Sequence, residues 1–185
     1  MNHLSLALAL SLGAALPALA ETSTFGKPKL ASPSSTADAP APVATTEPAG
    51  PANIVATDPA GIAAALQSFG YKAVLETDGN GDPKIRSGAA GSNFSIYFYG
   101  CSGGQDCRSI QLAAGFDLTN GTTLEVVNDW NAKKRYGKSY MDQDADPWLE
   151  MDLNLDFGGI SPDTFRDNLD LWERLVADFK THINW

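Results

Sequence analysis

Short runs of strictly alternating apolar and polar residues mark the second half of the chain. The clearest run is residues 149–157, whose odd-numbered positions are apolar and whose even-numbered positions are acidic or amide residues. Residues 93–100 and 109–116 alternate in the same way. Because alternation with a period of two is typical of half-buried strands, these runs predict a sheet with one apolar and one polar face.

The clearest run belongs to a strand expected near residues 148–156, and further strands are expected where the alternation is shorter, at residues 71–77, 84–86 and 138–142. The segments 78–83 and 144–147 consist almost wholly of turn-forming residues. We therefore expect each of these turns to join two antiparallel strands. Residues 93–100 and 109–116 are expected to form a third hairpin.

Three helices are predicted from their start signals. Asp58-Pro59 and Ser161-Pro162 each place a capping side chain before a first-turn proline, and Thr122 or Thr123 can cap a helix that runs to Lys134. The last helix carries an apolar stripe at spacings of three and four, formed by Phe165, Leu169, Trp172, Val176, Phe179 and Ile183. This stripe can pack on the sheet or form a homodimer contact.

The order of elements is helix, strands, helix, strands, helix. Strands in neighbouring hairpins form antiparallel sheets, and amphipathic helices need an apolar face to cover. The pattern therefore predicts an α+β fold with an antiparallel sheet of about five strands and helices packed on one face.

The first fifty residues differ in composition from the rest of the chain. Residues 1–20 combine a short apolar run with Ala18-Leu19-Ala20, the small-residue pattern of a signal-peptidase site. Residues 21–52 are rich in Pro, Ala, Ser and Thr and are expected to form a disordered linker. One domain is expected at 53–185, in a periplasmic or secreted protein that has no membrane segment after cleavage.

The formal net charge of the chain is −9, and no basic patch is visible in the sequence. This charge argues against nucleic acid and anionic membrane surfaces as partners, and it permits a cationic one. The two cysteines, Cys101 and Cys107, bracket a loop between two predicted strands. In an oxidising compartment they are expected to form a disulfide that staples the hairpin.

Two acidic turns have the spacing with which a calcium loop begins. Asp78, Asn80 and Asp82 have the spacing that opens an EF-hand loop, but the twelfth position is Ala89 instead of Glu. The same test on the turn that begins at Asp142 ends on Leu153. Both segments are therefore interpreted as solvated turns, and no metal and no cofactor are expected.

No catalytic motif is visible. After removal of the signal peptide the only histidine is His182, at the end of the last helix, and no nucleophile elbow, phosphate loop or zinc spacing occurs. The expected role is therefore non-enzymatic. The alternative is a hydrolase that uses surface carboxylates, or a calcium-dependent enzyme.

The polar face of the predicted sheet is the candidate binding surface. Acceptor side chains alternate with the buried set along the last strand, and outward-facing tyrosines are expected on a neighbouring strand, which gives the set Glu150, Asp152, Asn154, Asp156, Tyr97 and Tyr99. Trp148 lies on the same side. An acidic, aromatic, helix-free face predicts binding of a basic or extended protein or peptide partner.

Several segments of this chain resemble the YbjN-type bacterial sensory transduction regulator family. They are residues 82–85, 94–98, Cys101, Trp130-Asn131 with Arg135-Tyr136, residues 149–153, Gly158-Gly159, and the helix through Trp172-Glu173. The resemblance implies a fold similar to type III secretion chaperones. It also implies a regulatory or chaperone-like role without agreed catalytic residues. The chain departs from cytoplasmic members in its predicted signal peptide, its linker and its cysteine pair.

Overall fold

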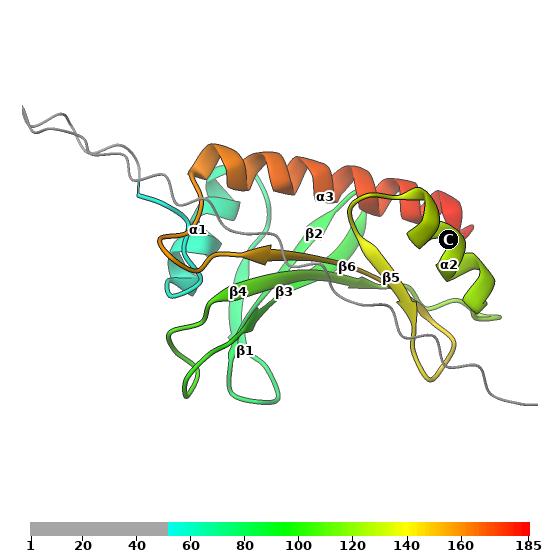
Figure 1. Ribbon diagram of the computed structural model, residues 1–185, viewed down its shortest axis with the longest axis horizontal. Coiled ribbons are helices and arrows are strands. Elements are labelled where there is room, and N and C mark those ends of the chain that lie inside the picture. The colour runs from blue at the N-terminus through cyan, green and yellow to red at the C-terminus, as the bar shows by residue number, and fades with distance from the viewer. Residues whose placement is uncertain (1–51) are drawn as a thin grey trace, which may run out of the picture. The chain divides into compact units, whose positions relative to one another are not determined.

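A computed structural model describes residues 52–185 of the chain (Figure 1). The predicted signal peptide, residues 1–20, and all but the last residue of the predicted linker, residues 21–52, lie outside the described residues. None of the helices within 52–185 combines the length and apolar character that a bilayer crossing requires.

The elements follow in the predicted order: α1 Pro59–Ser68, β1 Val74–Thr77, β2 Pro83–Ala89, β3 Ser92–Tyr99, β4 Ser109–Gly115, α2 Leu124–Lys133, β5 Lys138–Met141, β6 Pro147–Asn154 and α3 Pro162–His182. The α+β class is confirmed. The sheet has six strands, one for each of the segments that the alternation marks, where a sheet of about five was expected. The short strand predicted around residues 84–86 is a full strand of seven residues.

The strands are antiparallel and lie in the order β1-β2-β3-β4-β6-β5. The three predicted hairpins are confirmed, and the pairing of β4 with β6 joins the two halves of the chain, with Ile110 opposite Leu153. β5 is an edge strand and pairs with β6. The turn between β5 and β6 lies beside the end of β4, where the Phe116 N–H donates to the Pro147 carbonyl (3.1 Å).

One face of the sheet is covered by helices (Figure 1). α3 runs along this face, and all six residues of its predicted apolar stripe are buried. The stripe is therefore used within the chain to cover the sheet. α2 lies at one end beside β5, where Trp130 packs edge-on against Phe179 of α3 (4.8 Å between ring centroids).

The predicted caps hold the helix starts. The Asp58 carboxylate accepts the N–H of Gly61, the Ser161 hydroxyl accepts that of Thr164, and Thr123 caps α2. The choice between Thr122 and Thr123 is thereby resolved. Each cap satisfies an N–H that has no partner inside its helix.

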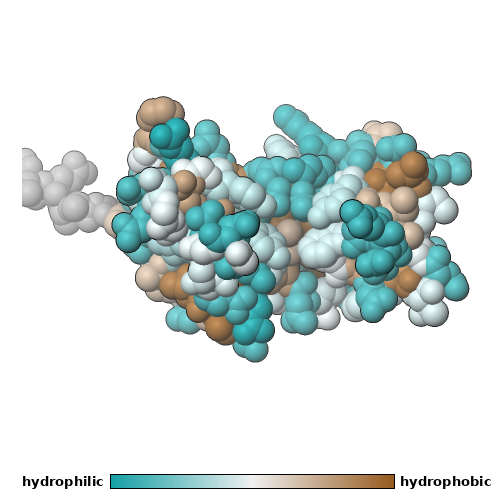
Figure 2. Space-filling view, turned by 90° about the horizontal axis from the view of Figure 1, so that it is seen from below, coloured by the Kyte–Doolittle hydropathy of each residue, from teal (hydrophilic) through white to brown (hydrophobic). Residues whose placement is uncertain are grey.

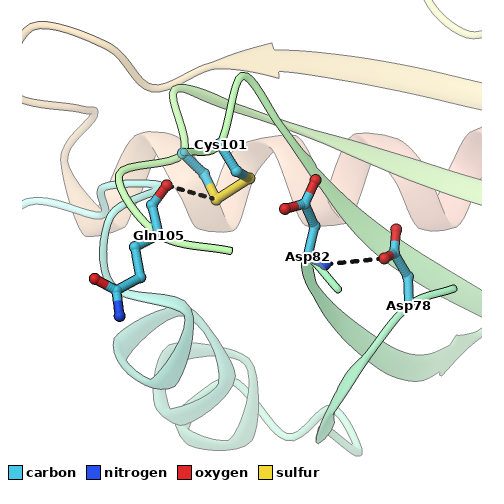
Figure 3. The surroundings of a disulfide bond; sticks show 5 residues. Asp78, Asp82, Cys101 and Gln105 are labelled. Atoms are coloured by element: carbon cyan, nitrogen blue, oxygen red, sulfur yellow. Dashed lines mark hydrogen bonds between the residues drawn. A yellow bond between two sulfur atoms is a disulfide. The ribbon is translucent and has the colours of Figure 1, made fainter. Parts of the chain in front are cut away.

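Cys101 and Cys107 form a disulfide in the loop between β3 and β4 (Figure 3). Residue 104 approaches the turn between β1 and β2 so closely that a Cβ on Gly104 would lie 2.7 Å from the Gly81 carbonyl oxygen. The stapled loop therefore packs on the turn that Asp78 organises, and Figure 3 shows the two side by side.

Candidate functional site: a groove on the helix-free face

The second face of the sheet has no helix over it and is hollowed. Figure 2 views the domain from this side and shows a recess between two raised sides. The recess is a groove of about 430 Å³, within the size range of small-molecule and peptide pockets. Its position follows from the two edge hairpins, β1–β2 and β5–β6, which lie at opposite edges of the sheet (Figure 1).

Three sets of residues line the groove. One side is formed by Lys72, Val74 and Arg86, at the edge formed by β1 and β2. The floor includes Asn93, Ser95, Tyr97, Ala113 and Gly115 of β3 and β4. The other side is formed by Asp117, Asp142, Asp146 and Trp148, around the β5–β6 turn.

Trp148 lies flat on the sheet because its neighbour on β4 has no side chain. Trp148 is opposite Gly115, and a Cβ on Gly115 would lie 2.8 Å from atoms of the indole ring. The indole Nε1 donates to the Asp142 Oδ2 (2.9 Å), and the ring stacks beside Tyr140 at 6.2 Å and 12°. The indole is therefore held in one orientation, with tyrosine beside it.

Asp142 fixes both the turn and the indole. Its Oδ1 accepts the N–H groups of Asp144 (3.0 Å) and Asp146 (2.9 Å), while Oδ2 accepts Trp148. The indole hydrogen bond, followed by the two backbone hydrogen bonds, lowers the pKa of the Asp142 carboxyl. The carboxylate is therefore ionised and saturated with donors, which suits it to positioning Trp148.

The opposite side of the groove is basic and also ordered by ion pairs. The Arg86 Nε lies 2.7 Å from Glu76, and the Lys84 Nζ lies 3.3 Å from the same carboxylate. Although desolvation opposes the effect, hydrogen bonds from Arg86 and Lys84 lower the pKa of Glu76. The ammonium of Lys84 also lies over the Tyr97 ring, 5.2 Å from its centroid.

The predicted acidic stripe lies on the same helix-free face but outside the groove. Lys138 Nζ lies 3.3 Å from Glu150 and 3.1 Å from Asp152, and the pairing with Asp152 is the main cause of the raised pKa of Lys138. The Gln111 amide donates to Asp152 (2.7 Å) and accepts the Tyr99 hydroxyl (3.2 Å). The negative charges of Glu150 and Asp152 are therefore partly neutralised by neighbouring side chains of the sheet.

The remaining predicted residues have other surroundings. The Asn154 side chain accepts the N–H of Asp156 (3.0 Å), and the Asp156 carboxylate accepts that of Phe157 (3.0 Å), so both organise the turn after β6. Of the six predicted binding residues, only Tyr97 lines the groove. The binding role of the stripe stays a prediction.

Sequence reasoning missed the basic side of the groove and, apart from Tyr97, its floor. Lys72 and Arg86 lie in short alternating segments, and neither Asn93 nor Gly115 carries a signal of its own. These residues could have been predicted only from the register of the strands, in which Arg86 pairs with Ser95 and Ser95 pairs with Ala113. This row of small residues places the groove between two ordered sides.

The titratable side chains within residues 52–185 were also candidates for acid–base or metal chemistry. Residues 52–185 hold no cluster of three or more His, Cys, Asp or Glu side chains that could bind a metal ion. Among the carboxylates of the described part of the chain, Glu76 and Asp142 have shifted pKa values, and both are shifted downward, opposite to what a general acid needs. His182 lies on α3, where its Nε2 is 2.9 Å from the Val126 carbonyl oxygen.

Comparisons with known proteins identify the family. No curated protein and no solved structure matches the chain. The model of the YbjN family, described as "Putative bacterial sensory transduction regulator", matches residues 58–185, which is most of the domain. The resemblance that the sequence segments indicated is therefore confirmed, and the chain belongs to the YbjN family.

Proposed function

We propose that this protein is an exported binding module, without enzymatic activity, that holds an extended segment of another polypeptide on the helix-free face of its sheet. Membership of a family described as regulatory is consistent with a binding module. The disulfide between Cys101 and Cys107 is compatible with the oxidising compartment that the predicted signal peptide implies.

The groove at Trp148 is the observation that carries the proposal. Recognition surfaces are enriched in aromatic residues, and a side chain that is already ordered loses little entropy when a partner binds. Here the indole is ordered before binding by Gly115, Asp142 and Tyr140. The floor beside it is built from small side chains, which leave room for a peptide backbone.

The acidic stripe belongs to the proposal as a flank of the groove. Glu150 pairs with Lys138 on β5 and lies two residues from Trp148 along β6. Because Lys138 already compensates Glu150 and Asp152, we place the main contact at the groove and a secondary electrostatic contact at the stripe. The alternative, a hydrolase based on surface carboxylates, would require two converging carboxylates with one raised pKa.

The test is capture of partners from periplasmic extract by the chain without residues 1–20. Gly115→Ala places a methyl group against the indole and should displace Trp148, so recovery of the partner should fall. Gly79→Ala is the matched control, because nothing lies within 4 Å of a Cβ at that position.

A second variant tests the stripe. Asp152→Lys should weaken recovery less than Gly115→Ala if the groove is the main contact. Equal recovery by all three variants and the unchanged chain would overturn the proposal. Hydrolysis of a peptide or glycoside by the unchanged chain, lost in Asp142→Asn, would favour the enzymatic alternative.

A further inference from the structure

The two sides of the groove carry opposite charges. Lys72 and Arg86 line the side formed by β1 and β2, whereas Asp117, Asp142 and Asp146 line the side that holds Trp148. Opposite charges on facing sides of one groove favour a ligand that is itself charged at both ends. The groove therefore distinguishes the two ends of an occupant.

Both sides retain groups that can bind a partner. Within residues 52–185, Lys72 forms no ion pair, and Arg86 contacts Glu76 through its Nε alone. On the acidic side, Asp146 uses Oδ1 to accept the Leu118 N–H (2.9 Å), and its Oδ2 has no donor in the described part of the chain. Asp117 is exposed and accepts no hydrogen bond there.

The indole of Trp148 suits a cationic side chain. Indole is the best aromatic partner for an ammonium or guanidinium group, and nearby carboxylates add to the attraction. This chain uses the same combination elsewhere, with Lys134 over the Trp130 ring at 5.1 Å and an ion pair from Lys134 to Asp178 at 2.7 Å. At Trp148 the carboxylates of Asp117 and Asp146 line the groove, but the cation is supplied by no described residue.

The register of the strands sets the distance between the basic and the acidic side of the groove. Arg86 lies on β2 and Trp148 on β6, with β3 and β4 between them. Arg86 lies in the same row as Glu150, so Trp148 is also offset by two residues, or about 7 Å, along the strands. Three steps of about 4.8 Å between strands, combined with this offset, place the two backbones about 16 Å apart. Because the indole lies over Gly115 on β4, the distance to be bridged is shorter, and an extended peptide covers it in about three or four residues at about 3.3 Å each.

We propose that the groove selects an extended peptide segment with a Lys or Arg on Trp148 and an Asp or Glu, three or four residues away, at Lys72 and Arg86. The segment crosses the strands, and its backbone lies over Ser95, Ala113 and Gly115. This inference rests on the proposed function and adds the chemistry of the partner. It explains why an acidic protein keeps two basic side chains beside its aromatic site.

The test uses blocked pentapeptides with a proline-rich spacer that keeps them extended. Lys-Pro-Thr-Pro-Glu should bind the chain without residues 1–20 about three- to tenfold more tightly than Gln-Pro-Thr-Pro-Gln, and the difference should shrink in high salt. Binding is measured by fluorescence polarisation of a labelled peptide and by the amide and indole shifts of Trp148 in NMR spectra. Equal affinity for the two peptides would overturn the proposal.

Charge-reversal variants locate the two ends. Asp117→Lys and Lys72→Glu should each lower the affinity for Lys-Pro-Thr-Pro-Glu by about three- to tenfold. Asp167→Lys, the same change on an exposed position of α3, should leave the affinity unchanged. The decisive result is rescue: Asp117→Lys should bind Glu-Pro-Thr-Pro-Glu better than the unchanged chain does. No rescue, or equal effects of Asp117→Lys and Asp167→Lys, would contradict the assignment.

The two proposals can fail separately. If Gly115→Ala lowers partner recovery but the pentapeptides show no charge preference, the binding groove stands and the chemistry assigned to its occupant is wrong. If Gly115→Ala leaves recovery unchanged and the pentapeptides do not bind, both proposals are wrong.

Discussion

Asn131 shows what a single side chain contributes to this fold. Its amide donates to the Ser139 carbonyl (2.9 Å) and accepts the Ser139 N–H (2.8 Å), so it pairs with the edge strand β5 as a neighbouring strand would. The adjacent Trp130 donates its indole N–H to the Gly137 carbonyl (2.9 Å). The Trp-Asn pair, a segment that indicated the family, therefore joins α2 to β5 and closes one edge of the sheet.

Replacing Asn131 should destabilise the domain without touching the groove. Asn131→Ala removes both hydrogen bonds and exposes the β5 edge, so the free energy of unfolding should fall by about 1–3 kcal/mol. Urea denaturation followed by circular dichroism measures this loss, and the Ser139 amide should exchange its hydrogen faster. Asn128→Ala, on an exposed position of the same helix, is the control. Equal stability of the two variants would contradict the role assigned to Asn131.

At the scale of elements, the two edge hairpins use the same turn. Asp78 accepts the N–H groups of Asn80 (2.8 Å) and Asp82 (3.0 Å), as Asp142 does in its own turn. In each turn the first residue also donates its N–H to the carbonyl of the fifth, at 2.8 Å for Asp78 and 3.0 Å for Asp142. The spacing that raised the calcium question is thus explained by hydrogen bonding within each turn.

The turn at Asp142 should make stability depend on pH. Its pKa is lower in the folded chain than in the unfolded chain, so its stabilising contribution is present above the unfolded pKa, about 3.9, and is lost as the pH falls through the folded value. Asp142→Asn removes this contribution. The difference in unfolding free energy between the unchanged chain and Asp142→Asn should therefore be larger at pH 6 than at pH 2.5.

Urea denaturation at the two pH values measures the effect, and the indole N–H shift of Trp148 in NMR spectra reports whether the indole has moved. Asp144→Asn is the matched control, because the Asp144 side chain is exposed and accepts no hydrogen bond among the described residues. If the difference for Asp142→Asn is the same at both pH values, the carboxylate of Asp142 does not stabilise the folded turn through its charge.

Most elements could be predicted because their signals are local. Asp58-Pro59 and Ser161-Pro162 begin helices by capping geometry, and the alternation of residues 149–157 follows from a sheet with one covered face. The pairing of β4 with β6 could not be predicted in the same way. Ile110 and Leu153 are paired although α2, β5 and most of β6 lie between them in the sequence. Nothing in the sequence around either residue indicates its partner.

At the scale of the whole molecule, the helix-free face was predictable but the groove was not. Tyr97 and Trp148 were placed on the outer face by alternation alone. The groove depends on small residues meeting in register on β3 and β4, and on an indole that lies over Gly115. These are relations between strands, and a periodic pattern within one strand carries no information about them.

The boundary of the domain is also a property of the whole molecule. The family match begins at residue 58, yet Ile54 and Ala56 are buried in the core. Ile54 exchanges two backbone hydrogen bonds with Ile160 (2.8 and 3.1 Å), and Gly159, at φ 71°, leaves no room for a Cβ beside the Ile54 carbonyl. Gly159 therefore allows the first residues of the domain to pair with the segment that leads into α3.

A chain that begins at Asn53 should consequently unfold like one that begins at residue 21, whereas a chain that begins at Asp58 should be less stable. Losing the buried Ile54 side chain and its two backbone hydrogen bonds should cost about 3 kcal/mol. Ile54→Ala in the longer chain, which keeps the backbone pairing, should lose less than the truncation does. Urea denaturation of the four chains measures these differences. Equal stability of the chains that begin at 53 and 58 would show that the domain is complete without the segment paired to Ile160.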